Sequence, residues 1–177
     1  NGMLLSKHIR LQAAFNHMHI FVDPTPDSAS AYEERQRLFN LPGCSWQDYN
    51  QKLMSTGGVI YNRSAKSLNL TPEIKKMLNT SKSSLTPTEL MLALLKMSVD
   101  LLWNGGIGTY VKGGPESHVE VGDRANDILR INGSELNAKV IGEGGNLGFT
   151  QLGRIEAALN GVRINADSVD NVAGVDC

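Results

Sequence analysis

Glycine and asparagine occur together at two places in the sequence, each directly after an apolar stretch. Because glycine has no Cβ, a flat ring or a sugar can approach its main chain, and an Asn amide offers one acceptor and two donors. This combination suits the ribose and the carboxamide of a nicotinamide nucleotide. One such motif alone is better explained as a turn, but two at equivalent positions favour a ligand site. The residues are Asn104, Gly105 and Gly106 in the first motif, and Gly144, Gly145 and Asn146 in the second.

A second candidate feature links Gly2 to Asp23. A dinucleotide site needs a glycine at a strand-to-helix turn, where backbone N–H groups approach the pyrophosphate, and an acid about twenty residues later for the adenosine ribose. Gly2 precedes a predicted helix, and Asp23 follows it by 21 residues at the end of the run HIFVD. An acid here favours NAD, since it would repel the 2′-phosphate of NADP and no Arg or Lys follows closely. A helix start followed by a solvated turn explains both residues equally well.

Other polar residues give weaker signals. Glu143, beside Gly144, either acts as a catalytic base or orders the strand end by accepting hydrogen bonds, and the ordering role is favoured. Residues 113–115, Gly-Gly-Pro, indicate a hinge or a mobile loop. The histidines show no spacing typical of a metal site or a catalytic triad; they are His8, His17, His19 and His118.

Strands and helices that alternate along the chain must position these residues. Apolar runs predict strands at residues 19–23, 57–61, 99–104, 138–143 and 162–167. Amphipathic or capped stretches predict helices at residues 2–16, 28–40, 45–53, 86–98, 123–129 and 150–160, with a further helix start at Thr71. Strands joined through helices pair in parallel, so the predicted class is α/β, a doubly wound, mostly parallel sheet of Rossmann type. Ligands bind beyond the carboxyl ends of such strands, and we expect the ends of HIFVD, LLWNGG and VIGEGGN to share one crevice.

The length, the net charge and the cysteines of the chain limit the kinds of partner that it can bind. A chain of 177 residues fits one domain, and we expect a dinucleotide-binding domain over residues 1–177. The formal net charge of −1 argues against nucleic acid and anionic membranes, which need a dense basic patch. No apolar run approaches the roughly 20 residues that span a bilayer. Cys44 and Cys177 lack a zinc-ligand spacing, so we expect reduced thiols and a cytoplasmic location. The first and last residues suggest a piece of a larger protein.

Five segments of the chain together resemble the large bacterial NAD-specific glutamate dehydrogenases. They are NGMLLSKHIRLQAAFNHMHIFVDPTPD, LLWNGGIGTYVK, GDRANDILRINGSEL, VIGEGGNLGFTQLGRIE and DNVAGVDC, in the order of that family. The resemblance implies oxidative deamination of L-glutamate to 2-oxoglutarate and ammonia, with hydride transfer to NAD. It also leads us to expect a homo-oligomer for the full-length protein.

For the adenosine half of NAD, the resemblance implies that Gly2 closes the pyrophosphate turn and that Asp23 binds the ribose. The first strand of the sheet would then lie upstream of Asn1, so we expect a sheet truncated at its first strand, whose unpaired edge invites another chain. The family's catalytic lysine and aspartate belong to a preceding domain that holds most of the L-glutamate. We therefore expect no dehydrogenase activity from the chain alone.

For the nicotinamide half, the resemblance implies that Asn104 and Gly105 line the cofactor cleft. Asn146 would meet the nicotinamide ribose, and Asn171 would face the nicotinamide amide. Val172 departs from the family's pattern next to Asn171. The chain itself contains no residue implied to be catalytic.

Two other functions fit the same residues. A regulatory module would bind NAD or an adenine nucleotide in the same cleft without chemistry. A structural α/β interaction domain would use its glycines only for turns. Upstream sequence that supplies a substrate domain would separate the enzyme from the regulatory module, and calorimetry with NAD would separate both from the structural domain.

Overall fold

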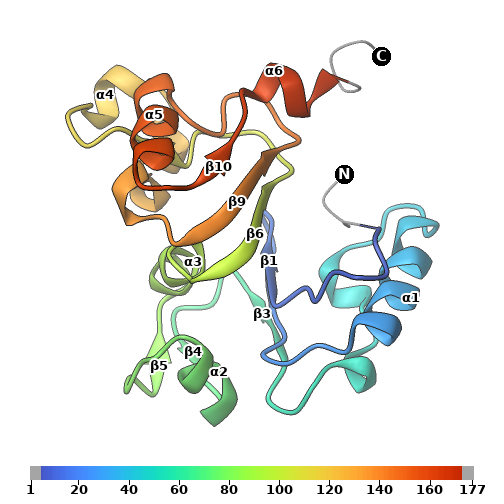
Figure 1. The fold of residues 1–177 in the computed structure, drawn as a ribbon. Helices are drawn as coiled ribbons and strands as arrows, with labels where there is room; N and C mark the ends of the chain where they lie inside the picture. Colours follow the sequence, from blue (N-terminus) through green and yellow to red (C-terminus); the bar gives the residue numbers. More distant parts are fainter. Residues whose placement is uncertain (1–4, 173–177) are drawn as a thin grey trace. The chain divides into compact units, whose positions relative to one another are not determined.

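The computed structural model describes residues 5–172, which fall into two compact units, residues 5–94 and residues 95–172. The mixed α/β class is confirmed (Figure 1). In place of one doubly wound sheet, the described residues form four small sheets, two antiparallel and two parallel. A single dinucleotide-binding domain over residues 1–177 stays a prediction.

The first unit contains an antiparallel sheet in the order β1-β2-β3. Its central strand is β2 (His19–Val22), between β1 (Ala13–Phe15) and β3 (Val59–Asn62). Every residue of β2 is buried, as its apolar run predicts. The prediction of parallel neighbours is wrong for this strand, because the Asn16 side chain accepts hydrogen bonds from the N–H groups of residues 18 and 19 at 2.8 and 2.7 Å. These bonds stabilise a tight turn that reverses the chain between β1 and β2.

The predicted helix over residues 2–16 is wrong in its described part. Residues 5–12 form neither helix nor strand, and residues 13–15 form β1. The apolar residues that indicated an amphipathic helix are used differently, since Leu11 and Ala14 pack against the core of this unit. Pairing with β2 and this packing outweigh the modest helix propensity of the segment.

Helix α1 (Ser28–Phe39) confirms the predicted helix at residues 28–40. The helix predicted for residues 45–53 is instead two 3-10 helices, η1 (Trp46–Asp48) and η2 (Gln51–Leu53). Side chains from the sheet, from α1 and from the segment around η1 form one apolar cluster, whose buried members are Phe21, Leu38, Trp46 and Tyr49.

Two helices that begin with Thr-Pro complete the first part of the chain. They are α2 (Pro72–Met77) and α3 (Pro87–Leu95), and the short strands β4 (Leu68–Asn69) and β5 (Ser84–Leu85) pair antiparallel. The Thr71 hydroxyl caps α2 by accepting from the Ile74 N–H at 3.3 Å. The apolar face of α3 is buried as predicted, at Leu90, Met91, Leu94 and Leu95.

Glu89 makes the start of α3 sensitive to pH. Its carboxylate accepts from the Thr86 N–H at 2.8 Å and from Lys82 Nζ at 3.0 Å, and these bonds lower the pKa of Glu89 from 4.5 to about 2. The folded-state pKa is depressed, so this stabilisation is present above pH 4.5 and is lost as the pH falls towards 2. We expect the difference in Tm between the parent and Glu89→Gln to shrink to zero across that interval, measured by circular dichroism. A difference that stays constant would contradict this role.

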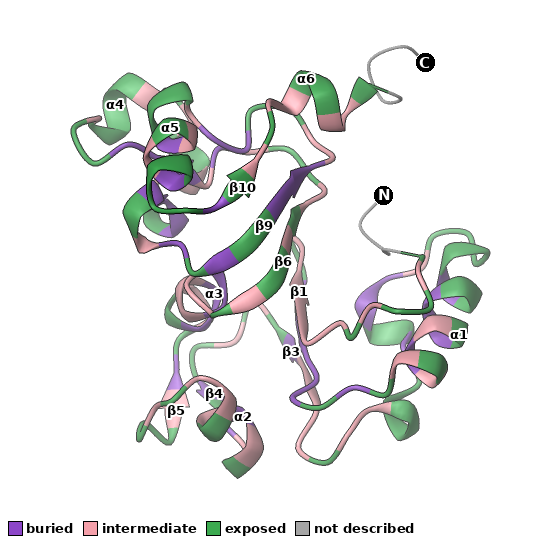
Figure 2. Cartoon of the chain, viewed as in Figure 1, coloured by how far each residue is buried: buried purple, intermediate pink, exposed green. Residues whose placement is uncertain are grey.

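The second unit is built on a parallel sheet in the order β10-β9-β6. Its strands are β6 (Val99–Asn104), β9 (Ala138–Glu143) and β10 (Arg163–Ile164), and all three predicted strands are confirmed. Helix α5 (Gln151–Leu159) connects β9 to β10 and lies beside the sheet (Figure 1). The last three residues of β9 are buried, whereas its middle carries exposed residues (Figure 2).

Short elements fill the connection from β6 to β9. β7 (Val111–Lys112) and β8 (Ile131–Asn132) pair in parallel, and the helical pieces are α4 (His118–Val121), η3 (Arg124–Leu129) and η4 (Gly133–Glu135). A last short helix, α6 (Asp167–Asp170), follows β10.

Residues 113–115, read from the sequence as a hinge or a mobile loop, make several hydrogen bonds in the structure, and their mobility stays a prediction. The Gly113 N–H donates to Glu116 Oε2 and the Gly114 N–H donates to Glu156 Oε2, both at 2.6 Å. The buried Lys112 Nζ donates to the Gly113 carbonyl at 3.1 Å. Gly114 is therefore held to α5 and Gly113 to Glu116 of the same loop, each by a charge-assisted hydrogen bond, which is stronger than a neutral one.

Candidate functional site

The carboxyl ends of β6 and β9 lie side by side at one edge of the parallel sheet. The strands pair in register up to Asn104 and Glu143, the last residues of each. Beyond the strands, the Gly145 N–H donates to the Asn104 carbonyl at 3.0 Å. The sequence predicted that these two glycine–asparagine motifs occupy equivalent strand ends, and the structure brings them together.

Glycine is required here for close packing between the two strand ends. A Cβ on Gly145 would overlap the carbonyl oxygen of Gly106, and a Cβ on Gly144 would overlap the indole of Trp103. The flat ring that lies on Gly144 is thus a side chain of the protein itself. Gly105, half-buried, begins the turn after β6.

Asn146 and Asn171 meet beyond this edge. Asn171 Nδ2 donates to Asn146 Oδ1 at 2.8 Å, although the residues are 25 positions apart in the sequence. The contact is exposed to solvent. The amide of Asn146, in the loop after β9, and that of Asn171, at the end of α6, can offer their remaining donors and acceptors to a ligand.

Glu143 is buried at the base of the same edge. Its Oε1 accepts from Arg154 Nη2 at 2.7 Å and from Arg154 Nε at 3.1 Å. The side chain of Glu143 is fully buried and that of Arg154 is 13% exposed. Burial raises the pKa of Glu143, and the Arg154 guanidinium opposes that rise. The pairing ties the end of β9 to α5, which agrees with an ordering role.

Helix α6 holds the loop after β9 through two aspartates. Asp170 Oδ2 accepts from the Glu143 N–H at 3.1 Å, and Asp167 Oδ2 accepts from the Leu147 N–H at 3.0 Å. The backbone around Asn146 is therefore fixed on both sides. Sequence reasoning missed Arg154, Asp167 and Asp170, and the signal that could have indicated them is charge at the start of the elements that follow a strand.

Two buried polar atoms at this edge have no hydrogen-bond partner within the described residues. They are Asn104 Nδ2, a donor, and Glu143 Oε2, an acceptor. Both lie beside Gly148, where an added Cβ would overlap Asn104 Nδ2 and would come within 3.2 Å of Glu143 Oε2. Unpaired buried polar atoms are costly, so a donor and an acceptor left free side by side fit a polar ligand or a bound water.

The adenosine-side prediction involves residues of the first unit. Asp23 follows β2 and is fully buried; its Oδ1 accepts from the Ser55 N–H at 3.1 Å and from the Ser55 hydroxyl. Its Oδ2 has no partner among the described residues. Gly2 lies outside the described residues. The structure places the ends of β6 and β9 side by side. A crevice shared by the three strand ends, and the part of Asp23 in it, stays a prediction.

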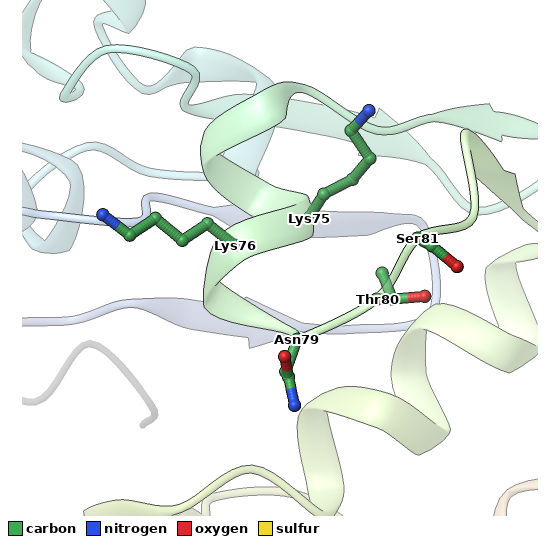
Figure 3. A pocket seen from close by; sticks show the side chains of 5 residues that line it. All are labelled: Lys75, Lys76, Asn79, Thr80 and Ser81. Carbon is green, nitrogen blue, oxygen red and sulfur yellow. The ribbon is translucent and has the colours of Figure 1, made fainter.

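A separate hollow lies at the end of α2, lined by Lys75, Lys76, Asn79, Thr80 and Ser81. The two lysine side chains point away from each other (Figure 3), so they do not converge on a ligand. Among residues 5–172, no group of three His, Cys, Asp or Glu side chains is placed to hold a metal ion. No helix in the same range is long and apolar enough to cross a bilayer.

The fold and the strand ends define a mixed α/β region with a polar, glycine-lined edge at the ends of β6 and β9. Residues 1–177 match the family model described as bacterial NAD-glutamate dehydrogenase, catalytic domain, and the chain belongs to that family. Relatives named NAD-specific glutamate dehydrogenase are 61% identical in Halomonas elongata and 62% identical in Pseudomonas aeruginosa, each over 177 residues. A relative of the same name in Mycobacterium tuberculosis is 54% identical over 183 residues. Each match covers 100% of this chain and 11% of the relative, so the chain spans about a tenth of their length.

Proposed function

We propose that this chain forms the NAD-binding part of a glutamate dehydrogenase that converts L-glutamate to 2-oxoglutarate and ammonia. In this proposal the β10-β9-β6 sheet belongs to a doubly wound nucleotide-binding sheet of the whole protein. The cofactor lies beyond the carboxyl ends of β6 and β9, where ligands bind in parallel sheets. Family membership and the relatives' names support the choice of NAD.

The observation that carries the proposal is the pair formed by Asn146 and Asn171. Their mutual hydrogen bond uses one donor of Asn171 and the carbonyl oxygen of Asn146. The Asn146 amide keeps two N–H donors and the Asn171 amide keeps its carbonyl oxygen. This set matches the nicotinamide half of NAD, where ribose hydroxyls and a carboxamide each need both donors and acceptors.

Asn104 and Glu143, the last residues of β6 and β9, carry buried polar atoms that fit the same cofactor. The free donor on Asn104 and the free acceptor on Glu143 would bind polar atoms of the nicotinamide nucleotide. Gly105 would allow close approach, while Gly144 and Gly145 set the packing of the two strand ends. When bound, NAD supplies the hydride acceptor. The residues of this chain hold and orient it, and Glu143 is placed by Arg154 as part of that support.

The reaction itself requires more than this edge. Hydride transfer needs the substrate carbon held at about 3–3.5 Å from the nicotinamide. By the family resemblance, the groups that bind and deprotonate L-glutamate belong to another part of the protein. We therefore propose that the 177-residue chain on its own binds NAD without oxidising glutamate. A homo-oligomeric, cytoplasmic full-length protein belongs to the same proposal.

Calorimetric titration of NAD into the chain tests the nicotinamide assignment. We expect Asn146→Ala and Asn171→Ala each to weaken binding about tenfold, because each removes one or more hydrogen bonds of about 1 kcal/mol. Both side chains are at the surface, so the Tm should stay within about 2 °C of the parent. Asn160→Ala, at the exposed end of α5, is the matched control and should bind NAD as the parent does. Parent-like binding by both site variants would refute the assignment.

A further inference from the structure

Helix α5 carries a stripe of large apolar side chains on its solvent side. Leu152 and Ile155 are 49% and 45% exposed, and Leu159 is 82% exposed. The three residues follow one another at intervals of three and four, so they lie along one face of the helix. Single exposed apolar residues are common on protein surfaces, whereas a stripe with this spacing indicates a face on which another element packs.

The opposite face of α5 is the one that packs against the second unit. Gly153 and Ala157 are buried there, and a Cβ on Gly153 would come within 2.7 Å of the backbone of Lys112. Gly133 of η4 approaches the same face so closely that its own Cβ would lie 2.4 Å from the Gly153 carbonyl oxygen. The helix therefore uses its small residues for close contact with the unit and leaves its large apolar residues outside.

Hydrogen bonds on two sides of α5 fix its rotation about its own axis. On one side, Arg154 Nη2 donates to the buried Glu143 at 2.7 Å. On the other side, the Glu156 carboxylate accepts from the N–H groups of Gly114 and Ser134, at 2.6 and 2.7 Å. Rotation that turned the apolar stripe inwards would break all three bonds, so the stripe is a fixed feature of the second unit's surface.

The spacing of the stripe predicts the shape of its partner. Apolar residues at positions i, i+3 and i+7 correspond to successive a and d positions of two helices that pack side by side. From Leu152 to Leu159 the stripe follows about 10 Å of helix, at a rise of about 1.5 Å per residue. A second helix with an apolar face of about two turns covers a stripe of this length.

The small size of the stripe argues against a second copy of this chain as the partner. A stable contact between separate proteins buries about 800 Å² on each partner, whereas the stripe consists of three side chains, two of which are already about half buried. A segment of the same polypeptide needs less area, because its covalent connection gives it a high effective concentration. Each match covers 11% of the relative, so most of the polypeptide in these relatives lies outside the matched region.

We propose that Leu152, Ile155 and Leu159 bind an amphipathic helix from a part of the full-length protein outside residues 1–177. The stripe is then the contact that joins the second unit to the rest of the polypeptide. Since α5 also holds Glu143 through Arg154, a helix bound on the outer face of α5 supports the end of β9 from behind. The inference goes beyond the proposed function, because none of the three apolar side chains belongs to the cofactor edge.

Photo-cross-linking in the purified full-length protein tests this proposal. A photoreactive phenylalanine analogue replaces Ile155, and mass spectrometry identifies the peptides that are linked after irradiation. We expect a link within one polypeptide, to an apolar peptide outside residues 1–177. Ala158 is the matched control position, because it is exposed on the same helix but lies off the stripe. The yield of the link should be several-fold higher from Ile155 than from Ala158.

Three results would overturn the inference: a product of twice the mass linked through α5 of a second copy, a link that stays within residues 1–177, or equal yields from the two positions. If the Ile155 variant does not fold, alkylation by a maleimide decides. In the full-length protein, Leu159→Cys should react at least tenfold more slowly than Ala158→Cys, and equal rates would show that the stripe faces solvent. None of these measurements uses NAD or glutamate, so their failure leaves the proposed function intact.

Discussion

Replacement of Arg154 by methionine is expected to lower the free energy of unfolding by about 3–5 kcal/mol at neutral pH, the cost of leaving a buried charge without its partner. Glu143 is fully buried, and its carboxylate receives two hydrogen bonds from Arg154. Without Arg154, the pKa of Glu143, already raised by burial, rises further. Urea unfolding of the variant and the parent, followed by circular dichroism, measures the difference.

The pH dependence of this loss follows from the sign of the shift. A carboxyl whose folded-state pKa is raised penalises the fold above its ordinary pKa of 4.5, and the penalty grows as the pH rises through the folded-state value. The loss in Arg154→Met should therefore increase as the pH rises above 4.5 and should shrink as the pH falls towards that value. The second substitution Glu143→Gln should restore at least half of the lost stability, because no buried charge remains.

A matched substitution tests whether the buried pair causes the effect. Arg163→Met removes an exposed arginine from β10 in the same unit and should change stability by less than about 0.5 kcal/mol. If Arg154→Met is no more destabilising than Arg163→Met, or if its effect does not depend on pH, the ordering role of Glu143 is wrong.

The strands could be located from the sequence because short apolar runs ended by Pro, Gly or Asn have few other interpretations. β2, β6, β9 and β10 all lie where such runs occur. Their partners were harder to predict. β6, β9 and β10 pair in parallel across helical connections as expected, whereas β2 pairs antiparallel because a single turn at Asn16 reverses the chain.

Residues 5–16 show where local patterns mislead. Their apolar spacing indicates an amphipathic helix, yet it also satisfies a strand at residues 13–15 and a covering segment whose carbonyls accept from Arg35. Pairing with β2, packing on the core and the bonds from Arg35, which lies 26 and 29 positions beyond its two acceptors, all favour the observed structure over the helix. A contact between residues so far apart in the sequence cannot be detected from local sequence patterns.

The strand-end motifs of the candidate site were predicted from the sequence, whereas the residues that support them were missed. Asn104, Gly145 and Asn146 stand out because glycine and asparagine follow two apolar runs in the same way, whereas one such motif alone is explained as a turn. Arg154 is an ordinary helical residue until the fold places it against Glu143. In the sequence, Arg35 is likewise one of several charged residues in a polar helix. Only the structure shows that its side chain is fully buried and that Nε and Nη1 have no partner among the described residues.

Substitution of Gly145 by alanine is expected to force the ends of β6 and β9 apart. The new Cβ would overlap the backbone carbonyl of Gly106, and a backbone atom cannot move aside as the end of a flexible side chain can. The hydrogen bond from the Gly145 N–H to Asn104 would then lengthen or break. We expect a loss of about 1–3 kcal/mol in stability, typical of overpacking, and, under the proposed function, a loss of NAD binding of at least tenfold by calorimetry.

Gly106→Ala supplies the control on the opposite side of the same contact. A Cβ on Gly106 would meet nothing within 4 Å, so the same change of one methyl group should leave stability unchanged or raise it by up to about 1 kcal/mol, through the restricted unfolded chain. NAD binding that is lost in Gly145→Ala and kept in Gly106→Ala would show that the spacing of the two strand ends, and not glycine content, shapes the cofactor edge. If the two variants have the same stability and the same NAD affinity, the close approach at Gly145 is not the reason why glycine occupies that position.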